Sequence, residues 1–308
     1  MSGRTVTRLI ALLAAATLAL PAGRAAAGSH VIQVHPGPGA IQDALARAHA
    51  GDVLNLHAGT YRVPEGLVIG TSVVIRSAGD GPVTVDGRCR VQYTIRAAAS
   101  GVRIRGLRVV GAAEGFGSYP AEIDFVAVKG GEVSGSVAVD TCKHASGEGG
   151  AEYGISVFSS GPIQVLDNRT SGFTDSGIYI GAISDTGAGT LRVEGNRSWA
   201  NARGVIVEDS SGSIAVAGNR LHHNRRVGVE GTINAGLYLH NSDGVRIRDN
   251  SITGDDENGI WLDQDSSDNR VVDNTISGHA ADLHNDGTGN CFAGNSYSTS
   301  TGSVSQAC

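Results

Sequence analysis

The sequence predicts an all-β protein built as a single-stranded parallel β-helix, in which short strands coil around one core. A phrase made of a small residue and an alternating apolar strand recurs between Gly154 and Leu283. Its period is about 22 residues, with insertions in two coils, and periods of this size are typical of solenoids. Apolar residues at every second position indicate strands, and so short a coil leaves no room for a helix between parallel strands.

A second alternating run follows each phrase and ends at an asparagine. The phrases open at Gly154, Gly177, Gly204, Gly236, Gly259 and Ala281, and the asparagines are Asn168, Asn196, Asn219, Asn250, Asn274 and Asn295. Stacked coils place equivalent residues in one column, about 4.8 Å apart. Asparagine tolerates a tight bend and its amide can hydrogen-bond along such a column. We therefore expect an asparagine ladder at one corner.

These repeats resemble those of the right-handed parallel β-helix, or pectate-lyase-like, superfamily. The resemblance covers essentially the whole chain after residue 27 and implies a right-handed coil. It implies no single activity, because lyases, hydrolases, esterases, epimerases and non-enzymatic proteins share the scaffold. The sequence lacks the paired-aspartate and Gly-His-Gly pattern of polygalacturonase-like hydrolases, the motif of pectin methylesterases and the Asp-Pro-His-Glu of alginate epimerases. No catalytic set is therefore transferred from these families.

Residues 1–27 predict a secretory signal peptide. Arg4 and Arg8 precede an apolar run from Leu9 to Leu20, and residues 25–27 are alanines suited to cleavage. Four cysteines, an even number, fit export to an oxidising space. Without the signal no run is long enough to cross a bilayer. We expect a secreted protein, extracellular or periplasmic, and the competing interpretation is a retained membrane anchor.

Composition narrows the fold and the partners. Forty-five glycines, few aromatics and a single methionine indicate a turn-dense β protein. A formal net charge of −6 argues against nucleic acid as the main partner, because phosphate binding needs a basic face. One continuous core predicts a single domain over residues 28–308, and we expect a monomer.

The coil begins with a strand at Val31 and a run from Ala40 to Ala48 that has helical spacing and good helix formers. A short capping helix is expected there, because the first coil otherwise exposes a strand edge and the end of the core. Alternating strands then continue, interrupted by loops at residues 112–122 and 141–152. Long loops on a solenoid are either functional or tolerated.

The cysteines form two candidate pairs. Cys291 and Cys308 bracket a Ser/Thr/Gly-rich tail without a strand pattern. Their disulfide would fasten residues 291–308 as a cap and stabilise the fold by about 3 kcal/mol through chain entropy. Cys89 and Cys142 are the remaining possible pair. No spacing of cysteine and histidine resembles a zinc site.

Strand alternation predicts two outward columns. The third residue of each phrase gives Ser156, Tyr179, Ile206, Tyr238 and Trp261. The next outward position, where each strand ends, gives Arg96, Lys129, Phe158, Gly181, Glu208, His240, Asp263 and His284.

Glu208, His240 and Asp263 follow one another in this second column and are the candidate catalytic residues. Neighbours would lie about 5 Å apart and the two carboxylates roughly 10 Å apart. That separation is close to the range of an inverting glycosidase, and the histidine could instead act as a base. The competing interpretation is that exposed solenoid positions are simply polar.

The neighbouring side chains suit a sugar. Tyr179, Tyr238 and Trp261 would form a platform of flat rings with polar edges. Arg96 and Lys129 could grip uronate carboxylates. Arg225, in a surplus loop from His222 to Asn234, could reach the same groove. Ordinary strand or solvated surface residues are the alternative.

The acidic clusters at residues 255–257 and 263–265 raise a Ca²⁺ hypothesis, although no calcium loop is matched and no other cofactor is expected.

The leading hypothesis is a secreted carbohydrate-active lyase or hydrolase that acts on an acidic polysaccharide. A non-catalytic glycan-binding or structural protein, and a cyclase of a small apolar metabolite, are the alternatives.

Overall fold

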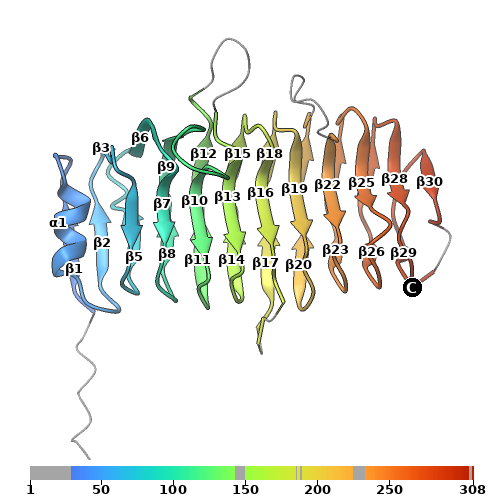
Figure 1. The fold of residues 1–308 in the computed structure, drawn as a ribbon, viewed down its shortest axis with the longest axis horizontal. Coiled ribbons are helices and arrows are strands. Elements are labelled where there is room, and N and C mark those ends of the chain that lie inside the picture. Colours follow the sequence, from blue (N-terminus) through green and yellow to red (C-terminus); the bar gives the residue numbers. More distant parts are fainter. Residues whose placement is uncertain (1–28, 143–149, 185, 188, 225–232, 305–306) are drawn as a thin grey trace, which may run out of the picture.

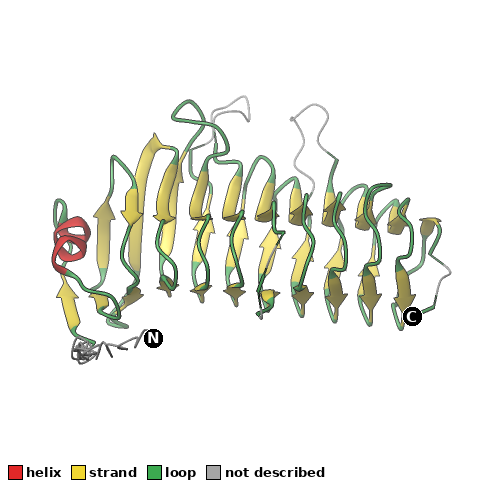
Figure 2. Cartoon of the chain, turned by 60° about the horizontal axis from the view of Figure 1, so that its bottom comes forward, coloured by secondary structure: helices red, strands yellow, loops and turns green. Residues whose placement is uncertain are grey.

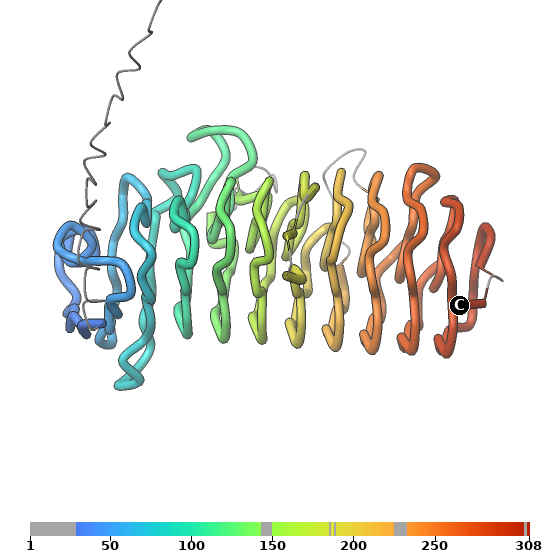
Figure 3. The backbone as a smooth tube through the Cα atoms, turned by 90° about the horizontal axis from the view of Figure 1, so that it is seen from below, coloured from blue at the N-terminus to red at the C-terminus, as the bar shows by residue number. Residues whose placement is uncertain are grey.

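A computed structural model describes residues 29–308 except 143–149, 185, 188, 225–232 and 305–306. The described strands wind into a right-handed parallel β-helix, with the coils stacked side by side along one axis (Figures 1 and 3). Three parallel sheets form its sides, which we call sheets A, B and C. The predicted fold class is therefore confirmed.

Each coil contributes one strand to each sheet over most of the axis. Sheet A contains β1 (Val31–Val34), β2 (Val53–Leu56), β5 (Val74–Ser77), β8 (Arg103–Arg105), β11 (Gly131–Ser134), β14 (Ile163–Leu166), β17 (Leu191–Glu194), β20 (Ile214–Ala217), β23 (Arg246–Arg248), β26 (Arg270–Val272) and β29 (Cys291–Ala293). Sheet B contains β3 (Gly59–Arg62), β6 (Val83–Val91), β9 (Arg108–Ala112), β12 (Val137–Val139), β15 (Arg169–Ser171), β18 (Arg197–Trp199), β21 (Arg220–His222), β24 (Ser251–Thr253) and β27 (Thr275–Ser277). Sheet C contains β4 (Leu67–Ile69), β7 (Tyr93–Ala97), β10 (Ala121–Val126), β13 (Tyr153–Phe158), β16 (Ser176–Gly181), β19 (Arg203–Glu208), β22 (Ala235–His240), β25 (Asn258–Leu262), β28 (Ala281–Asn285) and β30 (Ser300–Gly302).

The core is one column of apolar side chains that runs along the axis, because every strand points alternate residues inward. Ile178, for example, pairs in register with Ile155 on one side and Val205 on the other. The helix α1 (Ala40–Arg47) covers the N-terminal end of this column with the buried residues Ile41 and Ala44 (Figure 2). The predicted capping helix is thus present.

The predicted asparagine ladder is also present. Asn196 donates from Nδ2 to Oδ1 of Asn219 at 3.0 Å, and the same bond links each of the six predicted asparagines to the next. Each Oδ1 in turn accepts the backbone N–H of the preceding ladder residue, as in Asn196 N to Asn219 Oδ1 at 2.9 Å. Because Asn168, Asn196, Asn219, Asn250 and Asn274 are buried, the ladder satisfies polar groups that water cannot reach.

The C-terminal tail differs from its prediction. The alternating run that was predicted to end at Asn295 is β29, which pairs with β26. The Ser/Thr/Gly-rich stretch after it was expected to lack a strand, yet it contains β30, which pairs with β28. All three residues of β30 are exposed, so an inward apolar position could not reveal that strand in the sequence. Cys291 is disulfide-bonded to Cys308, and Cys89 to Cys142.

Residues 1–27, the predicted signal peptide, lie outside the described residues. Among the residues that are described, no helix has the length and apolar character needed to span a membrane.

Candidate active site on the outer face of sheet C

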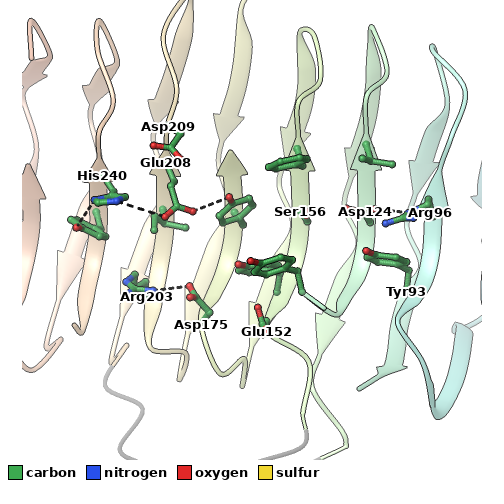
Figure 4. A pocket seen from close by; sticks show the side chains of 17 residues that line it. Tyr93, Arg96, Asp124, Glu152, Ser156, Asp175, Arg203, Glu208, Asp209 and His240 are labelled. Atoms are coloured by element: carbon green, nitrogen blue, oxygen red, sulfur yellow. Dashed lines mark hydrogen bonds and ion pairs between the residues drawn. The ribbon is translucent and has the colours of Figure 1, made fainter. Parts of the chain in front are cut away.

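A groove of about 820 Å³ lies on the outer face of sheet C, from β7 to β22 (Figure 4). The floor of the groove is formed by the outward-pointing residues of sheet C, which the parallel register of the strands aligns in one column. Successive residues of that column are Arg96, Asp124, Ser156, Tyr179, Ile206, Tyr238 and, beyond the groove, Trp261 and His284. The column of Tyr179 and Tyr238 was predicted correctly.

Aromatic rings on this floor stack on one another. Tyr153 stacks on Tyr179 at 4.4 Å between ring centroids, and Tyr238 stacks on Trp261 at 4.4 Å. This packing leaves Tyr179 and Tyr238 only 9% and 8% exposed. Burial, together with nearby carboxylates, raises the pKa of both hydroxyls. Tyr179 and Tyr238 therefore lie on the floor as predicted, but they are largely covered by neighbouring rings, and their role as a sugar platform stays a prediction.

Glu208, His240 and Asp263 come together beside the floor, as predicted. Glu208 pairs in register with His240, and Asp263 directly follows the strand that pairs with β22. Nδ1 of His240 lies 2.5 Å from Oδ2 of Asp263, and its Nε2 lies 4.0 Å from Oε1 of Glu208. Tyr179 donates its hydroxyl to Oε2 of Glu208 at 2.8 Å. The result is one chain of polar contacts from Asp263 to Tyr179.

Asp263 is placed to orient the histidine. Its side chain is 10% exposed, whereas that of His240 is 41% exposed. Its Oδ1 accepts a hydrogen bond from Ser266 Oγ at 2.8 Å. Since Asp263 engages Nδ1, the Nε2 atom of His240 is directed to Glu208 and the groove, where it could exchange a proton with a ligand.

Gly181 keeps the space in which Tyr179 meets Glu208. A Cβ built on Gly181 would collide with the Tyr179 ring. Packing therefore requires glycine at position 181, because a larger residue would displace Tyr179 from the carboxylate of Glu208.

A second row of charged residues borders the floor and was missed in the sequence. It consists of Glu152, Asp175 and Arg203 (Figure 4). Arg203 Nη1 pairs with Asp175 Oδ1 at 2.8 Å. Burial raises the pKa of Glu152 to about 7, and the nearby carboxylates of Asp175 and Glu114 add to the shift. The two rows thus place ionisable groups on both sides of the tyrosines.

Two of the predicted binding residues occupy other positions. Arg96 belongs to the floor column and not to the column of Glu208, and it is paired with Asp124 at 2.7 Å. Burial nevertheless raises the pKa of Asp124. Lys129 is exposed, does not line the groove and lies beyond the corner at Ala127, whose φ is 52°. Val126 takes the position predicted for Lys129, because it pairs with Phe158.

Two further predictions concern the C-terminal end and the surplus loop. His284 pairs with Trp261 and therefore continues the floor column, not the column of Asp263. Trp261 lies just outside the groove, where its Nε1 is 3.3 Å from Asp286 Oδ2. Arg225 lies outside the described residues.

The carboxylates considered for calcium have protein partners. Asp255 is buried, lies 3.1 Å from His279 Nε2 and accepts the backbone N–H of Asn224. Asp263 is held by His240 and Ser266. Among the described residues, no group of three or more His, Cys, Asp or Glu side chains could hold a metal ion.

Comparison with solved structures supports the fold. The chain is similar to pectate lyase Pel9A with a TM-score of 0.67 and 12% identity, over 92% of this chain and 79% of that one. It is similar to the endo-xylogalacturonan hydrolase from Aspergillus tubingensis with a TM-score of 0.50 and 13% identity, over 87% of this chain and 94% of that one. At such identities these likenesses establish the pectate-lyase-like β-helix and not an activity.

Comparison at the sequence level identifies the family. No curated protein matches the chain. Residues 116–307 match the model of the family described as "Periplasmic copper-binding protein (NosD)", and this match spans more than half of the chain. The chain therefore belongs to the NosD family of right-handed β-helix proteins.

Proposed function

We propose that this chain is an exported, carbohydrate-active β-helix enzyme that acts on an acidic polysaccharide in the groove of sheet C. The observation that carries the proposal is the polar chain Asp263, His240 and Glu208 at the edge of a tyrosine floor. The names of the similar structures, a pectate lyase and an endo-xylogalacturonan hydrolase, agree with this class of substrate.

Arg203 is suited to hold a uronate carboxylate. It lines the groove, and its Nε is buried without a hydrogen-bond partner in the described structure. Its Nη1 is committed to Asp175, so the guanidinium is held in place. A charge-assisted hydrogen bond from the exposed part of this guanidinium to a ligand carboxylate would add to the binding free energy.

This arrangement supports a lyase reaction. Nε2 of His240 takes the proton from the carbon next to the uronate carboxyl, while Asp263 holds the ring in the required tautomer. The resulting electron pair forms a carbon–carbon double bond as the glycosidic C–O bond breaks. The leaving oxygen receives a proton from the Tyr179 hydroxyl, which turns away from Glu208 to donate it, and Tyr179 regains a proton when His240 releases the one that it took.

A hydrolase reaction would use the same two rows differently. Glu152, with its pKa raised to about 7, could protonate the leaving oxygen, and Glu208 could activate water. The two reactions give different products, because only elimination creates an unsaturated sugar. The charged lining does not favour the third hypothesis, a cyclase of an apolar metabolite.

Copper is named in the description of the family, but the described residues lack the donors that it prefers. Cu(I) prefers thiolate and thioether ligands. Within the described residues every cysteine is in a disulfide, and the single methionine, Met1, lies outside them. No group of three or more His, Cys, Asp or Glu side chains among the described residues could hold a metal ion either. The described donors do not fit a copper centre, and no step is derived through copper.

The test is turnover on a panel of uronic-acid polysaccharides, followed by unsaturated-product absorbance and by reducing ends. Wild type should cleave at least one polymer, and the Glu208→Ala, His240→Ala double variant should lose this activity. Reducing ends without absorbance would select the hydrolase over the lyase. No turnover on any polymer, or full activity of the double variant, would reject the proposed chemistry. Binding without turnover would leave a non-catalytic glycan-binding protein.

A further inference from the structure

The outer face of sheet B carries three arginines in direct register. Arg169 on β15 pairs with Arg197 on β18, which pairs with Arg220 on β21. All three side chains are exposed. Neighbouring strands are about 4.8 Å apart, so three positive charges are held in a line along the axis of the coil.

Their charge is not compensated within the described structure. None of the three forms an ion pair with a described carboxylate. Arg197 donates from Nε to Nε2 of His222 at 3.0 Å, which is an uncharged acceptor when the ring is neutral. By contrast, Arg105 on sheet A is paired with Glu132 at 2.7 Å. Like charges directly opposite one another destabilise a sheet, so a ligand that removes the repulsion would bind favourably.

An aromatic column accompanies the arginines. Two residues further along β18 and β21, Trp199 pairs with His222, and their rings are stacked with centroids 5.9 Å apart. The guanidinium of Arg197 lies 5.1 Å from the centroid of the Trp199 ring. Flat rings beside guanidinium groups provide both apolar contact and charge-assisted hydrogen bonds.

We propose that this basic face, formed by Arg169, Arg197, Arg220, Trp199 and His222, is a binding site for a linear anionic polysaccharide that lies along the axis of the β-helix. Each guanidinium offers a planar fork to a carboxylate or sulfate group, and the regular strand spacing repeats that fork along the polymer. The ring of Trp199 contacts a sugar. The site lies on sheet B, whereas the groove lies on sheet C, so it would hold a polymer independently of the proposed catalysis.

The negative net charge of the whole chain implies that a polyanion could bind only at a confined basic patch. With a formal net charge of −6, the protein as a whole repels polyanions, so affinity for one must come from a confined patch. Three aligned cations are few for a duplex backbone, whose binding strength grows with the number of phosphates neutralised. A polysaccharide with one charge on each repeating unit fits the line better.

The test is the affinity of the protein for heparin at low salt, measured by titration calorimetry. The variant Arg169→Gln, Arg197→Gln, Arg220→Gln should weaken binding at least tenfold. A matched control is Arg192→Gln, Arg246→Gln, Arg270→Gln, which removes three exposed arginines from sheet A. The control should change the affinity less than twofold.

Two further readouts distinguish recognition of a sugar from a purely electrostatic contact. Trp199→Ala should weaken heparin binding severalfold while leaving the affinity for inorganic polyphosphate within twofold. The sheet B variant should unfold at no lower temperature than wild type without heparin. Heparin should raise the melting temperature of wild type and of the sheet A control, but not that of the sheet B variant.

The proposal is overturned if wild type does not bind heparin, if both triple variants weaken it equally, or if single-stranded DNA of equal charge binds as tightly. It is equally overturned if Trp199→Ala leaves heparin affinity unchanged. Variants at Glu208 and His240 should retain heparin affinity, so failure here and failure of the proposed enzymatic function are distinguishable.

Discussion

Asp263 gives His240 a defined orientation, and the chemistry proposed for the groove depends on this pair. The carboxylate is nearly buried and its second oxygen is occupied by Ser266, so it cannot turn away from the ring. Removing the charge without changing the shape would leave the histidine without the partner that fixes its tautomer.

We therefore predict that Asp263→Asn lowers kcat roughly 10²- to 10⁴-fold and leaves KM within a few fold. Asp265→Asn is the matched control, since Asp265 is exposed and its carboxylate accepts a hydrogen bond from the neighbouring Gln264 side chain at 3.5 Å. Steady-state kinetics on the substrate found in the polysaccharide panel would measure both. Equal losses in the two variants would remove the orienting role from Asp263.

The ionisation of Glu152 should determine how substrate binding in the groove responds to pH. Its pKa of about 7 means that it gains a negative charge as the pH rises through neutrality. That charge would repel an acidic substrate bound by Arg203. We predict that substrate affinity falls between pH 6 and 8 and that Glu152→Gln abolishes this fall. Binding isotherms across this range would check it, and an unchanged pH dependence in the variant would contradict it.

Glu122 provides a test of stability at a single residue. It is fully buried, with Oε1 accepting the backbone N–H of Gly111 at 2.9 Å and Oε2 lying 2.7 Å from Thr94 Oγ1. Burial raises its pKa to about 8 from an ordinary value of 4.5. Between these values the folded state holds a proton that the unfolded state releases, so stability decreases as the pH rises.

The Glu122→Gln variant should therefore resist alkali better than wild type. Between pH 5 and pH 9 wild type should lose on the order of 4 kcal/mol of unfolding free energy at this site. Glutamine keeps the neutral shape and should flatten the slope. Urea unfolding at several pH values would measure it, and identical slopes would contradict a protonated Glu122.

At the scale of elements, the repeated phrase predicted the strands that carry it. Glu208 and His240 were assigned correctly because the glycine that opens each phrase fixes the count to the end of β19 and β22. The coils of β7 and β10 have Thr94 and Glu122 in place of that glycine. Without the glycine as a reference, Lys129 was assigned to the column of Glu208. Lys129 lies beyond the corner at Ala127, and Val126, which pairs with Phe158, is the residue that continues the column.

The sequence analysis assumed that side chains alternate strictly between the core and the outside, and it therefore did not predict the second charged row. Tyr153 lies two residues before the interior Ile155, so alternation assigns it to the core, yet it stacks on Tyr179 outside. A side chain on the intervening Gly154 would collide with Phe173, which shows how tightly the backbone approaches its neighbours there. A residue pattern could not foresee this local departure, and it decides where Glu152 and Arg203 lie.

The asparagine ladder was predictable because its spacing and residue type both recur. Asn219 donates to Val193 O at 2.8 Å and to Asn250, and it accepts two bonds from Asn196. We predict that Asn219→Ala destabilises the fold by about 2–4 kcal/mol, because several buried polar groups lose their partners. Asn295→Ala, at the half-exposed end of the ladder, should cost less because water can replace its bonds. Thermal unfolding would rank the two, and equal losses would contradict a ladder that depends on burial.

At the scale of the whole molecule, stacking converts residues two dozen positions apart into continuous faces. Sheet C presents a groove with ionisable groups at both edges, and sheet B presents aligned arginines. The scaffold was predictable from periodicity, because each coil must bury its apolar face against the next. The substrate was not, because the same scaffold carries unrelated activities and the groove depends on side-chain contacts between coils.

The most direct test of the central claim is a crystal structure of the His240→Ala variant with a bound acidic oligosaccharide. The proposed function predicts a sugar over Tyr179 and Ile206 in the groove of sheet C, with its carboxylate on Arg203 and its glycosidic oxygen within hydrogen-bond distance of the Tyr179 hydroxyl. An oligosaccharide bound elsewhere, or one that contacts neither Arg203 nor the residues around Glu208, would contradict the assignment of this groove as the active site.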